Sequence, residues 1–331
     1  MWRPLKKTLA TLVPALLLIL FIAVMICFLN RWDSMVAITL IPVWAWAAFG
    51  MTLSLLSWVC FRGPFAAVVF SIWLASGLIL SEEPRSLIRE LYLQPASRLP
   101  EELKTLRVVN VNAEGMEENL RVSTVLKPDI IIIQQAPEGE ALKQLARDLF
   151  GDAHVVITNR SNAFIARGET VNTLGETDSA TLHVRILTPD GFLVDITNLD
   201  LAPYLPSPQL WKKEVWQRLT ATRVENRRLL RHYLGENQLS SGRIGRIVSG
   251  GFGTPPGDDV FRPLESAQLT DAFGEAGTGW GNTYPADYPL VRLDQIWASA
   301  NLRPLRAFTS VNRGSTHRIV VADFAVSLPE N

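Results

Sequence analysis

Several apolar runs in the last two thirds of the chain have a polar residue at or near one end. These residues can hold a cation, donate a hydrogen bond or exchange a proton: Asn112, Gln135, Asp200, Asp294 and His317. Carboxylate and amide oxygens suit hard divalent cations, and histidine changes its charge near neutral pH. A further apolar run, ending at Val248, leads into Gly250-Gly251-Phe252-Gly253. That segment offers no side chain for cation binding or proton transfer.

Together these segments resemble, in order and approximate spacing, the endonuclease/exonuclease/phosphatase family over residues 103–326. The resemblance implies a metal-dependent phosphoric ester hydrolase fold. Three positions match the family's active-site residues: Asn112 at the end of the first strand, Asp294 in Arg292-Leu293-Asp294-Gln295-Ile296, and His317 in Ser315-Thr316-His317-Arg318.

Five other family positions are substituted. Gln135 stands where the family has the Glu that holds the metal, and Asp200 stands where a His contacts the phosphate. Gly251 replaces the Asp that activates water, and Gly253 replaces the Asn that orients the phosphate. Thr316 replaces the Asp that orients the neighbouring His and supports the metal.

These substitutions predict impaired hydrolysis. A Gln at 135 removes a negative charge from a site built for Mg²⁺ or Mn²⁺. Loss of the base at 251 lowers the rate by roughly 10²–10⁴ through the acid–base contribution alone. Thr316 is expected to leave His317 without the carboxylate that would fix its tautomer. No metal is therefore expected in the site, with Mg²⁺ or Mn²⁺ required if the protein is active.

Several alternatives stay open. A relocated metal site could use carboxylates near the expected pocket: Glu114, Asp200, Asp258 and Asp259. His317 could donate to a phosphate beside Arg318 or close a buried hydrogen-bond network. Asp294 could be an active-site remnant or the ion-pair partner of Arg292.

Residues 209–234 predict a long helix with a strongly basic side. An amphipathic helix that covers a sheet with its apolar side accounts for this pattern. The alternative is contact with an anionic lipid surface or another polyanion through Arg227, Arg228 and Arg231.

The elements that must position these residues alternate between short apolar strands and helices, as in an α/β domain. Strands are expected at 106–111, 130–133, 155–157, 163–166, 246–249, 292–298, 305–309 and 319–326, with a hairpin formed by 181–187 and 192–197, and helices at 117–126 and 140–149. The four isoleucines at 130–133 are typical of a strand buried on both faces. The prediction is a two-sheet α/β sandwich.

Three apolar segments precede this domain: 9–29, 35–61 and 65–81. The first two are long enough to cross a bilayer as helices, and the third is at the short end of the spanning range. A cleaved signal peptide is the alternative for the first segment, and a buried or re-entrant helix for the third. The expected division is a three-span transmembrane anchor at 1–83, a juxtamembrane connector with a short amphipathic helix at 84–102, and the sandwich domain at 103–331.

The charge is balanced, with 32 basic and 32 acidic residues, so no specific nucleic-acid partner is expected. Arg3, Lys6 and Lys7 favour a cytoplasmic N-terminus, and three crossings then place the domain outside. The anchor resembles that of bacterial membrane-bound family members. The leading hypothesis is a multi-pass protein of the bacterial cytoplasmic membrane whose extracytoplasmic domain is non-catalytic or strongly impaired and binds a phosphorylated ligand or a membrane-protein partner. The alternatives are an active phosphodiesterase or phosphatase on an extracytoplasmic or lipid-linked ester, and a structural membrane subunit.

Overall fold

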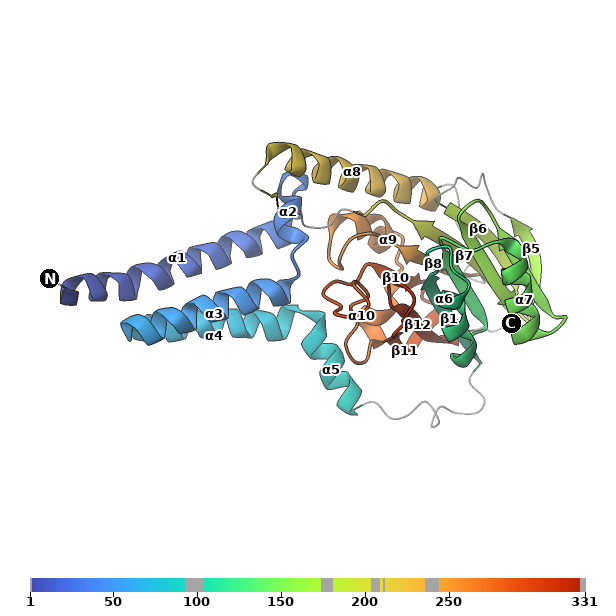
Figure 1. Cartoon of the computed structure of the whole chain (residues 1–331), viewed down its shortest axis with the longest axis horizontal. Helices are drawn as coiled ribbons and strands as arrows, with labels where there is room; N and C mark the ends of the chain where they lie inside the picture. Colours follow the sequence, from blue (N-terminus) through green and yellow to red (C-terminus); the bar gives the residue numbers. More distant parts are fainter. Residues whose placement is uncertain are drawn as a thin grey trace.

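The computed structural model describes residues 2–92, 104–173, 181–203, 209–210, 212–235 and 244–327. Apolar helices form its first part: α1 (Trp2–Asn30), the short α2 (Val36–Thr39), α3 (Val43–Phe61) and α4 (Pro64–Leu80). They extend away from a domain built of sheets and helices (Figure 1). Within the described residues, α1 and α3 are each long and apolar enough to cross a membrane. A third candidate span is α4 together with α5 (Glu82–Tyr92), which are bent by 60° at Ser81.

Small residues let the apolar helices pack closely. The buried Trp73 of α4 lies against Gly50 of α3, where a Cβ atom would come within 2.1 Å of its indole ring. The ring also makes an edge contact with Phe21 of α1, at 5.0 Å between centroids. Close approach at small residues is the usual packing mode of helices surrounded by lipid. The three helices therefore pack as a bundle.

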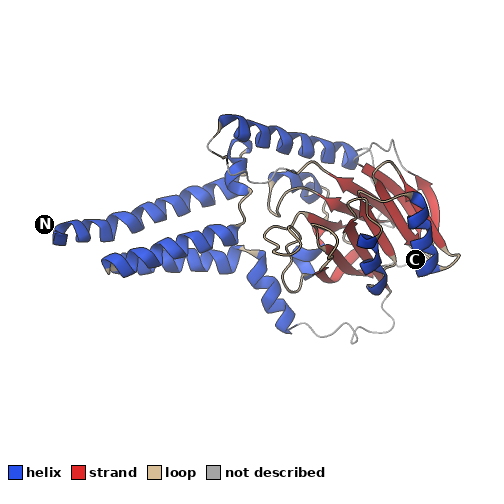
Figure 2. Ribbon diagram, viewed as in Figure 1, coloured by secondary structure: helices blue, strands red, loops and turns tan. Residues whose placement is uncertain are grey.

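Two six-stranded sheets make up the domain, and Figure 2 shows them beside each other. The first sheet has the order β11 (Leu302–Ser310), β12 (Ile319–Val326), β1 (Thr105–Asn112), β2 (Ile130–Gln134), β4 (Asn162–Arg167), β3 (His154–Thr158). The second has the order β5 (Glu169–Thr173), β6 (Thr181–Leu187), β7 (Leu193–Asp200), β8 (Gly245–Gly251), β10 (Asp294–Ala298), β9 (Thr270–Asp271). The predicted two-sheet α/β sandwich is confirmed.

The main core fills the space between the sheets, and two smaller cores lie on their outer faces. Helices α6 (Glu118–Val125) and α7 (Gly139–Phe150) cover the first sheet. Helices α8 (Lys213–Gly235) and α9 (Arg262–Ser266) cover the second. Ile130–Ile133 are completely buried because β2 lies in the middle of a sheet with a core on each side. A fifth domain helix, α10 (Ala272–Ala276), packs on β11.

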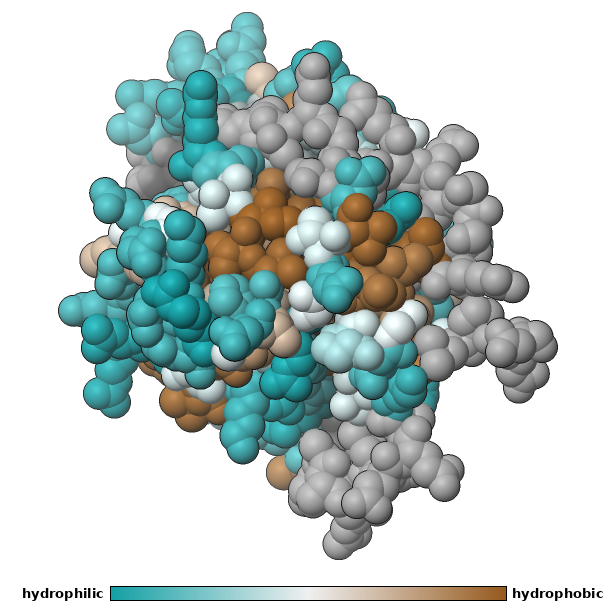
Figure 3. Space-filling model, turned by 90° about the vertical axis from the view of Figure 1, so that its right-hand side faces the viewer, coloured by the Kyte–Doolittle hydropathy of each residue, from teal (hydrophilic) through white to brown (hydrophobic). Residues whose placement is uncertain are grey.

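The predicted elements differ from the observed ones mainly at their ends. The long basic helix begins at Lys213 and not at 209, and the strand predicted from 292 begins at Asp294. The predicted amphipathic helix of the connector is α5, and the connector's remaining residues, 93–102, lie outside the described ranges. The end of the domain away from the apolar helices is largely hydrophilic, with one apolar area beside residues outside those ranges (Figure 3).

Candidate functional site

One edge of the sandwich gathers the residues that the sequence singled out. Strands β1 and β2 are parallel, as are β7 and β8, so the carboxyl ends of each pair meet at the same edge. Strand β10 is antiparallel to β8 and begins at that edge with Asp294. The register pairs Asp200 with Gly251 and Gly251 with Asp294. Gly251 therefore lies in one row between two carboxylates, and a Cβ atom there would be 3.4 Å from Asp200 Oδ1 and 3.8 Å from Asp294 Oδ1.

His317 pairs with Asp294. The distance from His317 Nδ1 to Asp294 Oδ2 is 2.8 Å, and Tyr284 packs on the imidazole at 5.1 Å between ring centroids. The expectation that Thr316 leaves His317 without a carboxylate partner is therefore wrong, because β10 supplies one. Burial opposes the charged imidazolium, but the neighbouring carboxylates, Asp294 first among them, outweigh it and raise the pKa of His317.

Arg292 is not the partner of Asp294. Its guanidinium is buried and pairs with Asp271 and with Glu82, at 2.5 Å and 2.9 Å between nitrogen and oxygen. Asp294 Oδ1 is buried and has no hydrogen-bond partner among the described residues. The Nε of Arg318 donates to the carbonyl of Ala286 at 2.8 Å. The partner of Asp294 is therefore His317 and not Arg292.

Gln135 lies beside Asp200, so the amide that replaces a glutamate in the family resemblance is next to the carboxylate that replaces a histidine. Burial and the charge of Asp294 raise the pKa of Asp200, and the neighbouring Gln135 side chain and the charge of His317 act against this shift. These polar neighbours therefore partly offset an environment that disfavours the carboxylate.

The other glycine of the motif is required by the backbone. Gly253 has φ of +65°, and a Cβ atom there would lie 2.6 Å from Pro203 Cα. Residues with a side chain rarely adopt this conformation, and here one would also collide with the chain leaving β7. The loss of a polar side chain at 253 thus accompanies a local close approach of two loops.

The segment that contains Thr316 is bound to the residues at the end of β1, where Asn112 lies. Thr316 donates to Glu114 through its hydroxyl, and also through its backbone N–H at 3.0 Å. The Ser315 hydroxyl donates to the carbonyl of Asn112 at 3.1 Å and accepts from the His317 N–H at 3.0 Å. These contacts fix the loop that presents His317.

A buried polar network below the site was not predicted from the sequence. Gln134 Nε2 lies 2.9 Å from Asn110 Oδ1 and 2.6 Å from Asn198 Oδ1, so it joins the two sheets. Ser249 donates to Asn110 from β8 at 3.0 Å. Each of these residues is buried, and each precedes a site position by one or two residues. Polar residues just before the ends of apolar strands were the signal that could have indicated this network. Amides buried at such positions require hydrogen-bond partners.

A groove of about 630 Å³ adjoins Gln135 and Asp200. Leu201 and Pro203 form one wall, and Ala221, Glu225 and Leu229 of α8 belong to the other. A small organic ligand of ordinary size fits this volume. The pair Gln135–Asp200 thus faces a space in which a ligand can lie.

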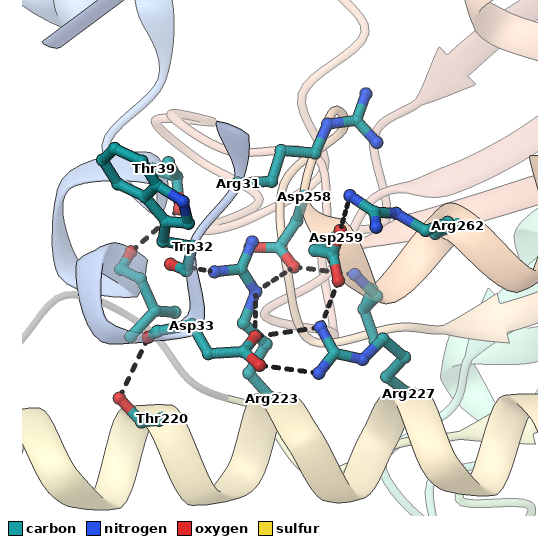
Figure 4. Close-up of polar contacts among 12 residues, drawn as sticks. Arg31, Trp32, Asp33, Thr39, Thr220, Arg223, Arg227, Asp258, Asp259 and Arg262 are labelled. Carbon is teal, nitrogen blue, oxygen red and sulfur yellow. Dashed lines mark hydrogen bonds and ion pairs between the residues drawn. The ribbon is translucent and has the colours of Figure 1, made fainter. Parts of the chain in front are cut away.

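The residues present do not fit the family's metal arrangement. Among the described residues, no group of three or more His, Cys, Asp and Glu side chains is arranged to hold a metal ion. Gln135 lacks the charge of the expected ligand, and one oxygen of Asp294 already pairs with His317. Asp258 and Asp259, weighed above for a relocated site, lie elsewhere and pair with Arg223 and Arg227 (Figure 4).

The three arginines proposed as an anionic-surface contact have different environments. Arg227 is largely buried between Asp33 and Asp259, so it does not form a free basic surface. Arg228 is exposed and pairs with Glu225 one turn before it. Arg231 is exposed and lines a second groove on the other side of α8. Only the last two are available to an outside partner.

Comparison with solved structures places this architecture among known folds. A superposable structure is the endonuclease/exonuclease/phosphatase protein from Beutenbergia cavernae DSM 12333, with a TM-score of 0.50 and 17% identity, covering 68% of this chain and 72% of that one. An endonuclease/exonuclease/phosphatase family protein from Bacteroides thetaiotaomicron has a TM-score of 0.49 and 14% identity, covering 69% and 98% of the two chains. No protein-family model matches the sequence, and no curated protein matches it. The domain thus has the endonuclease/exonuclease/phosphatase fold.

Proposed function

We propose that this chain is a membrane-anchored binding module whose endonuclease/exonuclease/phosphatase-fold domain is catalytically impaired. The neutral Gln135 beside Asp200, and the position without a side chain at Gly251 between two carboxylates, carry the proposal. The carboxylate that would hold a metal is replaced by a neutral amide, and the base that would prepare water is replaced by a glycine. Efficient ester hydrolysis needs charge neutralisation and a base at those points.

A phosphorylated ligand suits what is retained. Nδ1 of His317 pairs with Asp294, which raises the pKa of the imidazole and so favours its protonated form. In that form, Nε2–H is a charged donor. Charge-assisted hydrogen bonds to phosphate oxygens are stronger than neutral ones. The groove between Leu201 and α8 provides room for the remainder of the ligand.

The membrane orientation rests on which helix ends lie together. Gly63, in the turn between α3 and α4, lies against Ala10 of α1, so Arg62 is at the same end of the bundle as Lys6 and Lys7. Clustered basic residues favour the cytoplasmic side. The domain, at the other end, is then extracytoplasmic in a bacterial inner membrane. A C-terminal alkaline phosphatase fusion should be active and a matched cytoplasmic reporter inactive, and the reverse result would contradict this orientation.

Thermal unfolding of the full chain in detergent tests the binding role. A panel of phosphate mono- and diesters is added in excess EDTA, and at least one compound should raise the Tm without any metal. His317→Ala should abolish the shift, whereas His232→Ala, an exposed histidine on α8, should preserve it. A shift that appears only with Mg²⁺ or Mn²⁺ would contradict a metal-independent binding module.

An active hydrolase is the second candidate, and one observation favours it. The Asp294–His317 pair is intact, and Asp294 Oδ1, beside the space left by Gly251, is buried with no hydrogen-bond partner in the part of the chain that the structure describes. If this candidate is right, Mn²⁺-dependent turnover of a generic phosphodiester is measurable and is lost in Asp294→Asn. If the wild-type protein turns over no faster than Asp294→Asn, the result supports the impaired domain.

A further inference from the structure

Two ion clusters hold the domain on the ends of the apolar helices. In the first, Asp33, between α1 and α2, pairs with Arg227 of α8 at 2.7 Å, and the carbonyl of Trp32 accepts from Arg223 at 3.1 Å (Figure 4). In the second, Glu82 at the start of α5 pairs with the buried Arg292 at 2.9 Å. Each cluster joins the membrane part to the second sheet or its covering helix, so the domain is fixed at two separate points.

These attachments turn the site-bearing edge of the sandwich toward the apolar helices. Pro255 and Pro256, which follow Gly253 closely in the chain, line a small space together with Phe28 of α1 and Leu80 of α4. Trp280 contacts Trp44 of α3 at 6.2 Å between ring centroids. The edge at which β8 ends is therefore next to the end of the helix bundle.

Helix α5 has one polar side and one exposed apolar side. On the polar side, Arg89 donates to the carbonyls of Gly277 and Gly274, at 2.9 Å and 3.2 Å, and Glu83 accepts from Asn282. The other side carries exposed large apolar residues at helical spacing: Leu87, Ile88, Leu91 and Tyr92. Since α5 leaves α4 at 60°, it runs obliquely away from the bundle axis directly after the last apolar segment.

The loop from Tyr284 to Val291 joins the site to a second exposed apolar patch. Tyr284 packs on His317, and the carbonyl of Pro289 accepts from the indole of Trp280 at 2.7 Å. Between these two attachments, the side chains of Tyr288 and Leu290 are 80% and 52% exposed. The loop thus extends from the site toward the Trp280–Trp44 contact.

We propose that α5 and the 284–291 loop insert their exposed apolar side chains into the interface of the bilayer that the chain's own helices cross, so that the site opens at the membrane surface. Continuity with α4 and contact with α3 identify this bilayer as the occupant. Tyrosine and leucine side chains at the edge of a polar surface are typical of interfacial segments. A ligand held in the bilayer by its own apolar part could then reach His317 with its polar head. The proposal needs the apolar helices to cross a membrane, but it does not depend on what the site binds.

Spin-label accessibility in the full chain reconstituted into phosphatidylcholine–phosphatidylglycerol nanodiscs tests the insertion. Nitroxides are placed by Leu91→Cys and Tyr288→Cys, in a background of Cys27→Ala and Cys60→Ala. Val171→Cys is the matched control, since Val171 is an exposed apolar residue on β5, at the opposite end of the domain (Figure 1). Leu55→Cys, on the exposed side of α3, reports whether that helix crosses the bilayer.

The nitroxides at positions 91 and 288 should be highly accessible to oxygen. They should be much less accessible to a water-soluble nickel chelate than the nitroxide at position 171. Equal nickel accessibility at 91, 288 and 171, with position 55 still in lipid, would overturn the insertion and leave the anchor intact. A water-accessible position 55 would instead contradict the membrane anchor itself. Protection of 91 and 288 from both reagents, together with dipolar coupling between copies, would show that a second copy covers these patches and would also overturn the proposal.

Discussion

At the scale of single residues, the site depends on how charge is distributed among a few side chains. Asp294 pairs with His317, and Gln135 lies beside Asp200. Gly251 separates the two carboxylates within one row of the sheet. A family-type arrangement would add carboxylates at positions that here carry an amide, a hydroxyl or no side chain. The retained pair can hold a proton, and this suits the negatively charged ligand proposed above.

The raised pKa of His317 predicts a pH-dependent contribution to stability. The charged pair is fully present below the ordinary histidine pKa of 6.5, and its stabilisation is lost as the pH rises through the raised value. His317→Asn should therefore reduce stability most below pH 6.5, by about 1.5–3 kcal/mol for a charged hydrogen bond, and progressively less above it. Unfolding of both proteins across this range measures the difference.

Histidine NMR provides an independent check. The pKa of the buried His183 is lowered to about 4, mainly by desolvation, so its resonances should not titrate between pH 5.5 and 8.5. The signal that disappears in His317→Asn should titrate above 6.5. Titration of that signal below 6.5 would show that Asp294 does not stabilise the imidazolium.

The residue pairings could be predicted from the sequence only in part. The site positions themselves could be proposed from the sequence because each lies at or next to the end of an apolar strand. The partner of His317 was missed because Asp294 lies 23 residues away, while Thr316 is adjacent. Arg227 was interpreted as a surface residue because its partner Asp33 is 194 residues away in another segment.

At the scale of elements, α8 does more than cover a sheet. Its apolar residues, including Leu230, pack in the core on the outer face of the second sheet. Arg223 and Arg227, about one turn apart, reach the linker between α1 and α2, and Trp216 donates to the carbonyl of Ser34. The helix therefore connects the site groove with the apolar helices.

Breaking the buried part of this connection should destabilise the protein strongly. Arg223 is completely buried and pairs with Asp258 at 2.9 Å. Asp258→Asn leaves that guanidinium short of charge compensation, so we expect a loss of about 3–5 kcal/mol in the free energy of unfolding. Glu225→Gln removes an exposed ion pair on the same helix and should leave the stability nearly unchanged. Similar losses for the two variants, measured in denaturant, would argue against the cluster as an anchor.

Elements with strong apolar patterns were predicted well, and weakly patterned ones were missed. Strand β2 consists of four consecutive isoleucines followed by Gln134, and the position and burial of the isoleucines were both expected. Strand β5 is at the edge of its sheet, consists mainly of polar residues and has its valine exposed, so no pattern indicated it. Helices α9 and α10 are each only five residues long, too short for a periodic signal.

At the scale of the whole molecule, the chain combines a sandwich of known fold with apolar helices that meet its site-bearing edge. The two ion clusters, at Asp33 and at Glu82, fix this arrangement. The sequence predicted both parts but not their contact, because no local pattern encodes an interface between distant segments. A ligand site facing the bundle would distinguish this protein from a soluble domain on a flexible tether.

Isothermal titration of the full chain with Mn²⁺ tests the central claim most directly. Gln135→Glu, Gly251→Asp and Thr316→Asp together restore the family's carboxylates, and the backbone at 251 accepts a side chain because its Cβ would make ordinary contacts. The wild-type protein should give no heat beyond that of Asp294→Asn, while the triple variant should bind Mn²⁺ saturably. Saturable binding of one Mn²⁺ by the wild-type protein, abolished in Asp294→Asn, would contradict the account.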